Sequence, residues 1–315
     1  MFALRLVAVT FSVFVLVYCG MSLAVLCTWR RICHYGDGLP LQRLAQLLFF
    51  WRLFPLFIAI LITAGFAVPS FLLLEPRAIV EPIGSAPIVL ALFGTVLAAL
   101  GLGNAALSWR RACSTVSSWT SAAEPVQSVA SVPVLRIQRS IPPLTAAGIL
   151  RSKILLSGSA EFLLNGNELR TALNHEIAHI HRRDNLKKLL LRFVPFLGMR
   201  ALETAWLEAS EMAADDAAIC STADALDLAA ALIKLSRLKP AEAAPDLTAA
   251  LVQGRAAIIH ARVERLISWT GEAQPRSSSS ATMILSFSIP AIGLFLITYG
   301  SLLADVHQAT EWLVR

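Results

Sequence analysis

Charged residues are missing from four long stretches of the chain. These uncharged stretches cover residues 6–29, 53–74, 82–109 and 277–304. A helix needs about 20 apolar residues to cross the hydrocarbon of a bilayer. We therefore predict an α-helical membrane protein with four transmembrane helices, at about 6–28, 50–74, 86–108 and 281–304.

The first stretch could instead be a cleaved signal peptide. Such peptides carry positive charge ahead of an apolar run of about 7 to 15 residues. Here the run is longer, and the arginine pair Arg30 and Arg31 follows it. We therefore interpret the stretch as a retained membrane helix.

The arginines near the predicted helices indicate how the chain is oriented. Arg30, Arg31 and Arg43 lie in the first loop, and the third helix runs directly into Arg110 and Arg111. Because short cytoplasmic loops are enriched in Lys and Arg, we expect this loop and residues 111–280 to be cytoplasmic. Both termini, including the short tail 305–315, would then be extracytoplasmic in a multi-pass protein of the bacterial inner (plasma) membrane.

The insert between the third and fourth helices, residues 111–280, is long enough for one domain with its own core. After a Ser-rich linker come strand-like runs at 132–138 and 152–157. Apolar residues at helical spacing follow from Leu169 onward, and further helices are predicted at about 201–220 and 224–238. Strands followed by helices predict an α+β domain.

Composition narrows the class of protein. Hydrophobic residues make up 56% and charged residues 15% of the chain, against about 25% charged in soluble proteins, so a wholly soluble enzyme is excluded. The five cysteines are scattered and imply no disulfide framework. The net charge of +6 suits segments that face anionic lipid, and without a basic stripe interleaved with aromatic residues we expect no nucleic acid as a partner.

A candidate metal site lies in the first predicted helix of the insert. His175-Glu176-Ile-Ala-His179 is an H-E-x-x-H sequence. Residues four apart share one helical face, so both imidazoles can bind one zinc ion, and Glu176 is placed to act as a general base. Chance is an improbable source of this pattern in a chain with six histidines.

A zinc hydrolase needs a third protein ligand and keeps one open position. The carboxylates of the next predicted helix are candidates: Glu208, Glu211, Asp215 and Asp216. Glu211 and Asp215 lie four apart, so one could bind zinc while the other holds a histidine ring. For Glu208 and Asp216 a solvated or capping charge is the simpler interpretation. Periodicity alone does not choose among Glu208, Glu211 and Asp215.

Together these motifs resemble those of a known group of enzymes. The pairing of AxxHEIAHIxRxD with a later E-x-x-A-D, in a cytoplasmic insert between membrane helices, is similar to the integral-membrane gluzincin peptidases. The BlaR/MecR type, metallopeptidase family fifty-six, is the nearest resemblance, and it extends to GILRSKILLSGSAEFLL and ARVERLI. Beta-lactam sensors of this type carry an extracellular sensor domain after the last helix, whereas this sequence stops at Arg315, so we do not expect antibiotic sensing.

The resemblance implies a zincin-like metallopeptidase domain with one Zn2+ per chain and a role for each matching residue. His175, His179 and Glu211 would be the zinc ligands and Glu176 the catalytic base. Asp215 would orient a ligand, and Asp184 matches an acidic position that follows the motif in related families.

The predicted activity is zinc-dependent endoproteolysis of a cytoplasmic or membrane-proximal protein in regulated signalling. The expected partners are the lipid bilayer and a protein or peptide substrate, such as a cytoplasmic repressor. We expect the substrate to add as a strand along a sheet edge, either at Ala146, Ala147, Gly148 and Ile149 or at 154–157. Two alternatives remain: a quality-control peptidase of the HtpX and CAAX-endopeptidase kind, and a non-catalytic zinc-bound signalling scaffold.

The apolar segment 189–199 is too short to span a membrane, and we expect it to pack in the core rather than dip to the membrane surface.

Overall fold

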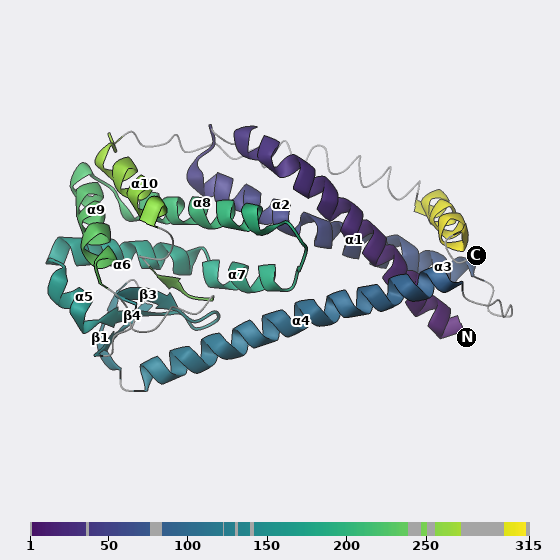
Figure 1. The fold of residues 1–315 in the computed structure, drawn as a ribbon, viewed down its shortest axis with the longest axis horizontal. Coiled ribbons are helices and arrows are strands. Elements are labelled where there is room, and N and C mark those ends of the chain that lie inside the picture. The colour runs from purple at the N-terminus through teal and green to yellow at the C-terminus, as the bar shows by residue number, and fades with distance from the viewer. Residues whose placement is uncertain are drawn as a thin grey trace. The chain divides into compact units, whose positions relative to one another are not determined.

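The structure is a computed structural model. It describes residues 2–35, 38–75, 84–121, 123–129, 132–138, 142–238, 247–250, 256–271 and 299–312. The chain divides into two compact units, and Figure 1 labels the helices and strands of both. One contains Met1–Arg30, Trp51–Leu100 and Gln274–Arg315, and the other contains Arg31–Phe50 and Gly101–Ala273.

Long apolar helices dominate the first part of the chain. These are α1 (Phe2–Tyr35), α2 (Leu41–Ile62), a π-helical turn (Thr63–Ala67), α3 (Val68–Leu74) and α4 (Ser85–Thr120). Among the described residues, three segments are long and apolar enough to cross a membrane: Phe2–His34, Leu41–Leu74 and Ser85–Thr120. Most of the predicted fourth helix, residues 281–298, lies outside the described residues, and residues 299–312 are helical.

Helix α4 differs from the sequence prediction, which placed a Ser-rich linker after residue 110. The helix continues through that segment to Thr120. Its serines accommodate the helix by bonding back to it, as the Ser118 hydroxyl does to the carbonyl of Thr115 at 2.8 Å. Trp119, which is buried, packs against Ala147 and Leu155 of the sheet. Tertiary packing therefore extends the helix beyond its apolar stretch.

The second unit contains a small mixed sheet. Its strands are β1 (Glu124–Val129), β2 (Val132–Ile137), β3 (Leu144–Ala147), β4 (Lys153–Ser157) and β5 (Ala249–Ala250). They lie in the order β1-β2-β4-β3-β5. Strands β2 and β4 are parallel, and the other neighbours are antiparallel. The runs predicted at 132–138 and 152–157 correspond to β2 and β4.

Where this unit is described, six further helices follow the first strands: α5 (Gly158–Leu163), α6 (Gly166–His181), α7 (Asp184–Arg192), α8 (Arg200–Ala218), α9 (Thr222–Ser236) and α10 (Ala256–Ile267). Asn165 and Glu168 form a reciprocal capping box that starts α6. Ser221 caps α9, because its hydroxyl accepts a hydrogen bond from the Asp224 backbone N–H.

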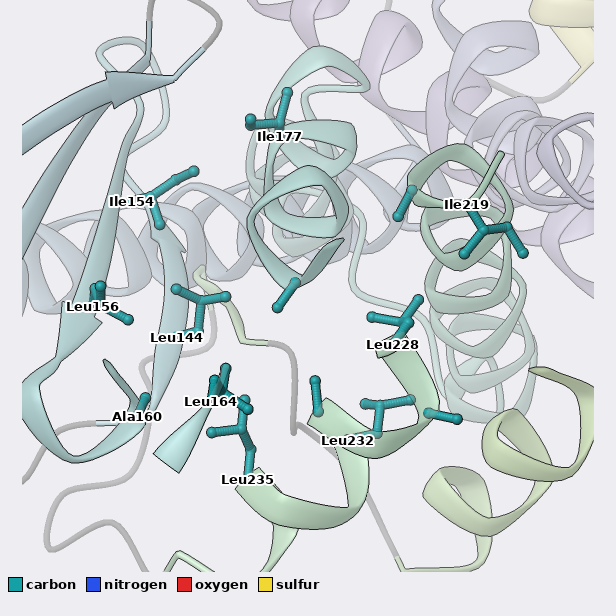
Figure 2. Close-up of a cluster of buried hydrophobic side chains, with 14 of the residues drawn as sticks. Leu144, Ile154, Leu156, Ala160, Leu164, Ile177, Ile219, Leu228, Leu232 and Leu235 are labelled. Atoms are coloured by element: carbon teal, nitrogen blue, oxygen red, sulfur yellow. The ribbon is translucent and has the colours of Figure 1, made fainter. Parts of the chain in front are cut away.

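The main core of this unit lies between the sheet, α6 and α9 (Figure 2). Leu144 and Ile154 from the sheet face Leu228 and Leu232 of α9, with Ile177 of α6 nearby. Fully burying a side chain of this size contributes about 1.5–3 kcal/mol. This packing fixes α6 against β3, and α6 carries the H-E-x-x-H sequence.

Candidate metal centre

The two histidines of the motif lie side by side on α6. The Nε2 atoms of His175 and His179 are 3.1 Å apart, and both side chains are buried. Donors around one tetrahedral zinc ion, at Zn–N distances of about 2.0–2.1 Å, lie about 3.3 Å from each other. The spacing of the two nitrogens fits a shared ion.

Helix α8 brings Glu211 to the same point. Its Oε2 lies 3.6 Å from Nε2 of His175, and its Oε1 lies 3.5 Å from Nε2 of His179. A ligand atom from each of these three residues lies within 4.8 Å of the other two. Two imidazoles and one carboxylate form the donor set of His2Glu zinc hydrolases, so these residues fit a zinc ion.

Each histidine ring contacts a second carboxylate through its other nitrogen. Nδ1 of His175 lies 2.9 Å from Oδ1 of Asp215, and Nδ1 of His179 lies 2.8 Å from Oδ2 of Asp184. Asp184 itself accepts a hydrogen bond from the Ser210 hydroxyl at 3.1 Å. Carboxylates in these positions fix the orientation and tautomer of each ring and leave both Nε2 atoms for a metal.

Arg262 of α10 joins two of these acidic residues, and the sequence analysis missed its role. Its guanidinium donates to both oxygens of Asp215, at 2.8 and 2.6 Å, and to Oε2 of Glu211 at 3.0 Å. The sequence does contain a sign of this role, because Arg262 falls on the apolar stripe formed by Ile259, Val263 and Leu266. A charged residue on the core-facing stripe of a helix requires a buried partner.

Glu176 contacts the sheet. Its Oε2 accepts a hydrogen bond of 2.7 Å from the backbone N–H of Ala146 in β3. Its Oε1 is buried and has no hydrogen-bond partner among the described residues. An unsatisfied buried oxygen beside the donor set is what a base for an attacking water requires.

Burial and charge shift the pKa values of these groups in different directions. Burial raises the pKa of the Glu176 carboxyl to about 8. Burial lowers the pKa of His175, but hydrogen bonds with Asp215 and Glu211 outweigh it and raise this pKa to about 9. Burial also works against ionised Glu211, yet the charges of His179 and Arg262 lower its pKa to about 2. Without a metal, the cluster thus holds an ionised carboxylate, Glu211, beside a histidine that must lose its proton before its ring can bind a cation.

The remaining candidates lie outside this cluster. Glu208 is half-buried on α8, Asp216 pairs with Arg265 at 2.6 Å, and His181 is exposed. These positions agree with the interpretation of Glu208 and Asp216 as charges that do not bind metal.

The structure differs from the prediction that a substrate strand adds to a sheet edge at 146–149 or at 154–157. Residues 154–157 form β4, which lies between β2 and β3 and is therefore no edge. The segment Ala146, Ala147, Gly148 and Ile149 begins in β3, where Ala146 is paired with Ala249 of β5. The side-chain amide of Asn185 donates to the carbonyls of Ala146 and Gly148 at 3.1 and 3.0 Å. The short strand β5 comes from a segment without strand pattern, which is why the sequence did not predict it.

The donor set, the buried Glu176 and the α+β scaffold fit a zinc site. In agreement, residues 146–290 match the model of peptidase family M48, a family of zinc metallopeptidases. No curated protein matches the chain. The match supports a zinc peptidase of the membrane type and does not support the more specific BlaR/MecR resemblance of the sequence motifs.

Proposed function

We propose that this protein is a membrane-embedded zinc endopeptidase that hydrolyses cytoplasmic or membrane-proximal protein substrates. The observation that carries the proposal is the convergence of His175, His179 and Glu211, whose ligand atoms lie within 4.8 Å of one another, next to an unpaired oxygen of Glu176. The match of residues 146–290 to a zinc peptidase family supports the same activity.

In the proposed mechanism, His175, His179 and Glu211 hold one zinc ion, which when bound supplies Lewis acidity and lowers the pKa of water toward about 7. Glu176 accepts a proton from the attacking water at its unpaired Oε1 and delivers it to the leaving amide nitrogen. Asp215 and Asp184 hold the two rings in place, and Arg262 holds Asp215 and Glu211.

The substrate would bind as an extended strand next to β3. Because β5 already pairs with β3 through Ala146 and Ala249, a substrate must either continue the sheet beyond β5 or take the place of this two-residue strand. In both cases it comes near Ala146, whose N–H contacts the base. Backbone pairing would orient the scissile bond without requiring a particular sequence.

Two roles are compatible with this activity. Regulated signalling proteolysis, for example of a cytoplasmic repressor, follows from the BlaR/MecR resemblance of the motifs. A quality-control role of the HtpX kind agrees equally well with the match to peptidase family M48. The non-catalytic scaffold is disfavoured, since a structural metal does not need the buried base Glu176.

The decisive experiment compares protein fragments in cells that carry the wild-type chain, Glu176→Gln or Glu208→Gln. Glu208 is a matched control because it is a carboxylate of α8 outside the metal cluster. Fragments should disappear with Glu176→Gln and persist with Glu208→Gln. A few fragments from one protein would favour signalling, whereas fragments from many membrane proteins would favour quality control. Unchanged fragments in metal-replete Glu176→Gln would refute the peptidase.

The orientation in the membrane is also part of the proposal, with the metal cluster on the cytoplasmic side of the bacterial inner membrane. The arginines after the first and third apolar stretches support it. Reporter fusions at residue 38 and after Arg315 should report inside and outside, respectively. The opposite pattern would reverse the topology while leaving the chemistry of the site intact.

A further inference from the structure

The connection between α7 and α8 exposes apolar side chains between two arginines. Its sequence is Arg192-Phe-Val-Pro-Phe-Leu-Gly-Met-Arg200. Leu197 is 91% exposed, and Phe193 is 38% exposed. Exposed apolar side chains that gather in one place usually mark a contact with a partner protein or with lipid. Figure 1 shows the connection at the end of the unit opposite α9.

This connection lies directly against α4. A Cβ atom placed on Gly101 would be 2.5 Å from the carbonyl oxygen of Phe193 and 3.3 Å from the Cδ of Pro195. Only glycine permits such an approach of two backbones. The contact is internal to the second compact unit, which begins at Gly101.

The position of Gly101 along α4 measures the depth of the contact. The uncharged part of this helix runs from Ser85 to Trp109, and a span requires about 20 residues. Every window of that length within 85–109 contains residues 90–104. Gly101 therefore lies inside the hydrocarbon for every placement of the span within 85–109. When the span is placed midway in this range, Gly101 lies about 9 Å from the C-terminal end of the span, at about 1.5 Å per residue.

A second contact joins the middle of α8 to the segment just before an apolar stretch. Trp206 packs against Phe49 at a ring-centroid distance of 5.9 Å, and the Lys187 ammonium lies 5.8 Å from the same Phe49 ring. Phe49 comes just before the uncharged stretch that starts at Leu53. From Trp206 the helix leads back toward Arg200 and the apolar connection.

We propose that the connection between α7 and α8 inserts the exposed side chains of Phe193 and Leu197 into the cytoplasmic leaflet of the bilayer, with lipid hydrocarbon as their partner, while Val194 and Met199 stay buried in the protein core, as expected for this segment. Arg192 and Arg200 are then within reach of the lipid phosphates, because arginine extends its charged end from an apolar region toward the interface. Backbone groups at this depth need partners. The N–H groups of Phe193 and Val194 have them, in the carbonyls of Leu190 and Leu191 at 3.1 and 3.3 Å.

The insertion fixes the distance of the metal cluster from the lipid. Glu211 follows Arg200 by 11 residues on the same helix, which corresponds to about 16 Å. A protein bound at the cluster would be held near the membrane surface. The insertion itself does not depend on peptidase activity, so it can be tested apart from the proposed function.

The test uses the full chain in phosphatidylcholine–phosphatidylglycerol vesicles, with the five native cysteines replaced by serine. Leu197→Cys is labelled with an environment-sensitive nitrobenzoxadiazole dye. Phe162→Cys on α5 is the matched control, since Phe162 is 93% exposed. We expect spin-labelled lipid to quench the dye at 197 severalfold more than at 162, and aqueous iodide to show the reverse. Equal access of iodide to both sites, or shielding of 197 from both quenchers by a protein contact, would overturn the proposal.

A pair of glycine substitutions tests the contact with α4. Gly101→Leu should push the Phe193 carbonyl away and reduce lipid quenching at residue 197. Gly103→Leu is the control, because nothing lies within 4 Å of a Cβ at Gly103. Circular dichroism and gel filtration check that each variant is folded. Equal quenching in folded Gly101→Leu and Gly103→Leu would contradict the proposed anchoring against α4.

Discussion

Two groups of histidine and carboxylate side chains occur in the described residues, one in each compact unit. His175, His179 and Glu211 form the first, and Glu75, His307 and Glu311 form the second. Both meet the same distance limit of 4.8 Å. Their surroundings differ, and the difference shows what a metal site needs beyond proximity.

The first cluster is buried and held by further hydrogen bonds, whereas the second is more open. Side-chain exposure is 0%, 3% and 11% in the first cluster, but 44% for Glu311 in the second. Nδ1 of each histidine in the first cluster contacts a carboxylate. His307 contacts Glu311 and Glu75 through Nε2 alone, at 3.5 and 4.0 Å. The second group resembles an ion-pair network in which Arg5 contacts Glu75 at 2.8 Å.

The strongest test of this comparison is the metal content of ligand variants. Glu211→Ala should abolish zinc binding, because two imidazoles remain where three protein ligands are required. Glu311→Ala, the corresponding change in the second cluster, should leave one zinc per chain. Elemental analysis of the purified proteins measures both. Loss of zinc in Glu311→Ala with retention in Glu211→Ala would invert the assignment of the two clusters.

The second test separates catalysis from metal binding. Glu176→Gln should retain one zinc and lower peptide cleavage by about 10²–10⁴-fold, the usual contribution of a general base. The amide keeps the size of the side chain but cannot accept a proton. Zinc content and the cleavage rate of a fluorogenic peptide are measured on the same sample. Full activity in a metal-replete variant would remove Glu176 from the mechanism.

Sequence reasoning went furthest where local periodicity places residues on one helix. The spacing of His175 and His179 sufficed to put them on one face of α6, and the spacing of Glu211 and Asp215 did the same on α8. Periodicity did not select Glu211 over Glu208, since residues three apart lie on related faces of the same predicted helix. The resemblance to known peptidases made that choice, and the structure brings Glu211 to the histidines.

The features that were missed depend on contacts between distant segments. Arg262 reaches Asp215 across 47 residues of sequence, and β5 joins β3 across about a hundred. The end of α4 was also missed, because the packing of Trp119 against the sheet keeps a Ser-rich segment helical. A short segment of the sequence does not reveal contacts with distant segments. The exception is Arg262, whose position on an apolar stripe is visible in the sequence.

A third and smaller effect is expected at the two arginines that contact cluster carboxylates. Arg262→Met should weaken zinc binding by about 10–100-fold, the typical cost of losing a group that orients metal ligands. Arg5→Met, which removes the contact with Glu75, should not change it. Competition with a chelator measures both affinities. Arg262→Lys should recover part of the loss, whereas equal affinities for wild type and folded Arg262→Met would exclude this role.

The smallest expected effect concerns protons. The raised pKa of His175, about 9, means that its ring is protonated at neutral pH without metal. Zinc requires the neutral imidazole, so binding should release about one proton from this ring, and the apparent affinity should rise about tenfold per pH unit until pH 9. Calorimetry in buffers of different ionisation enthalpy counts the released protons. Because the Asp215 contact raises the pKa of His175, Asp215→Asn should weaken binding and also reduce the number of protons released near pH 8. Proton release that is unchanged in this variant would assign the proton to another group, and the buried Glu176 carboxyl would then be the first to examine.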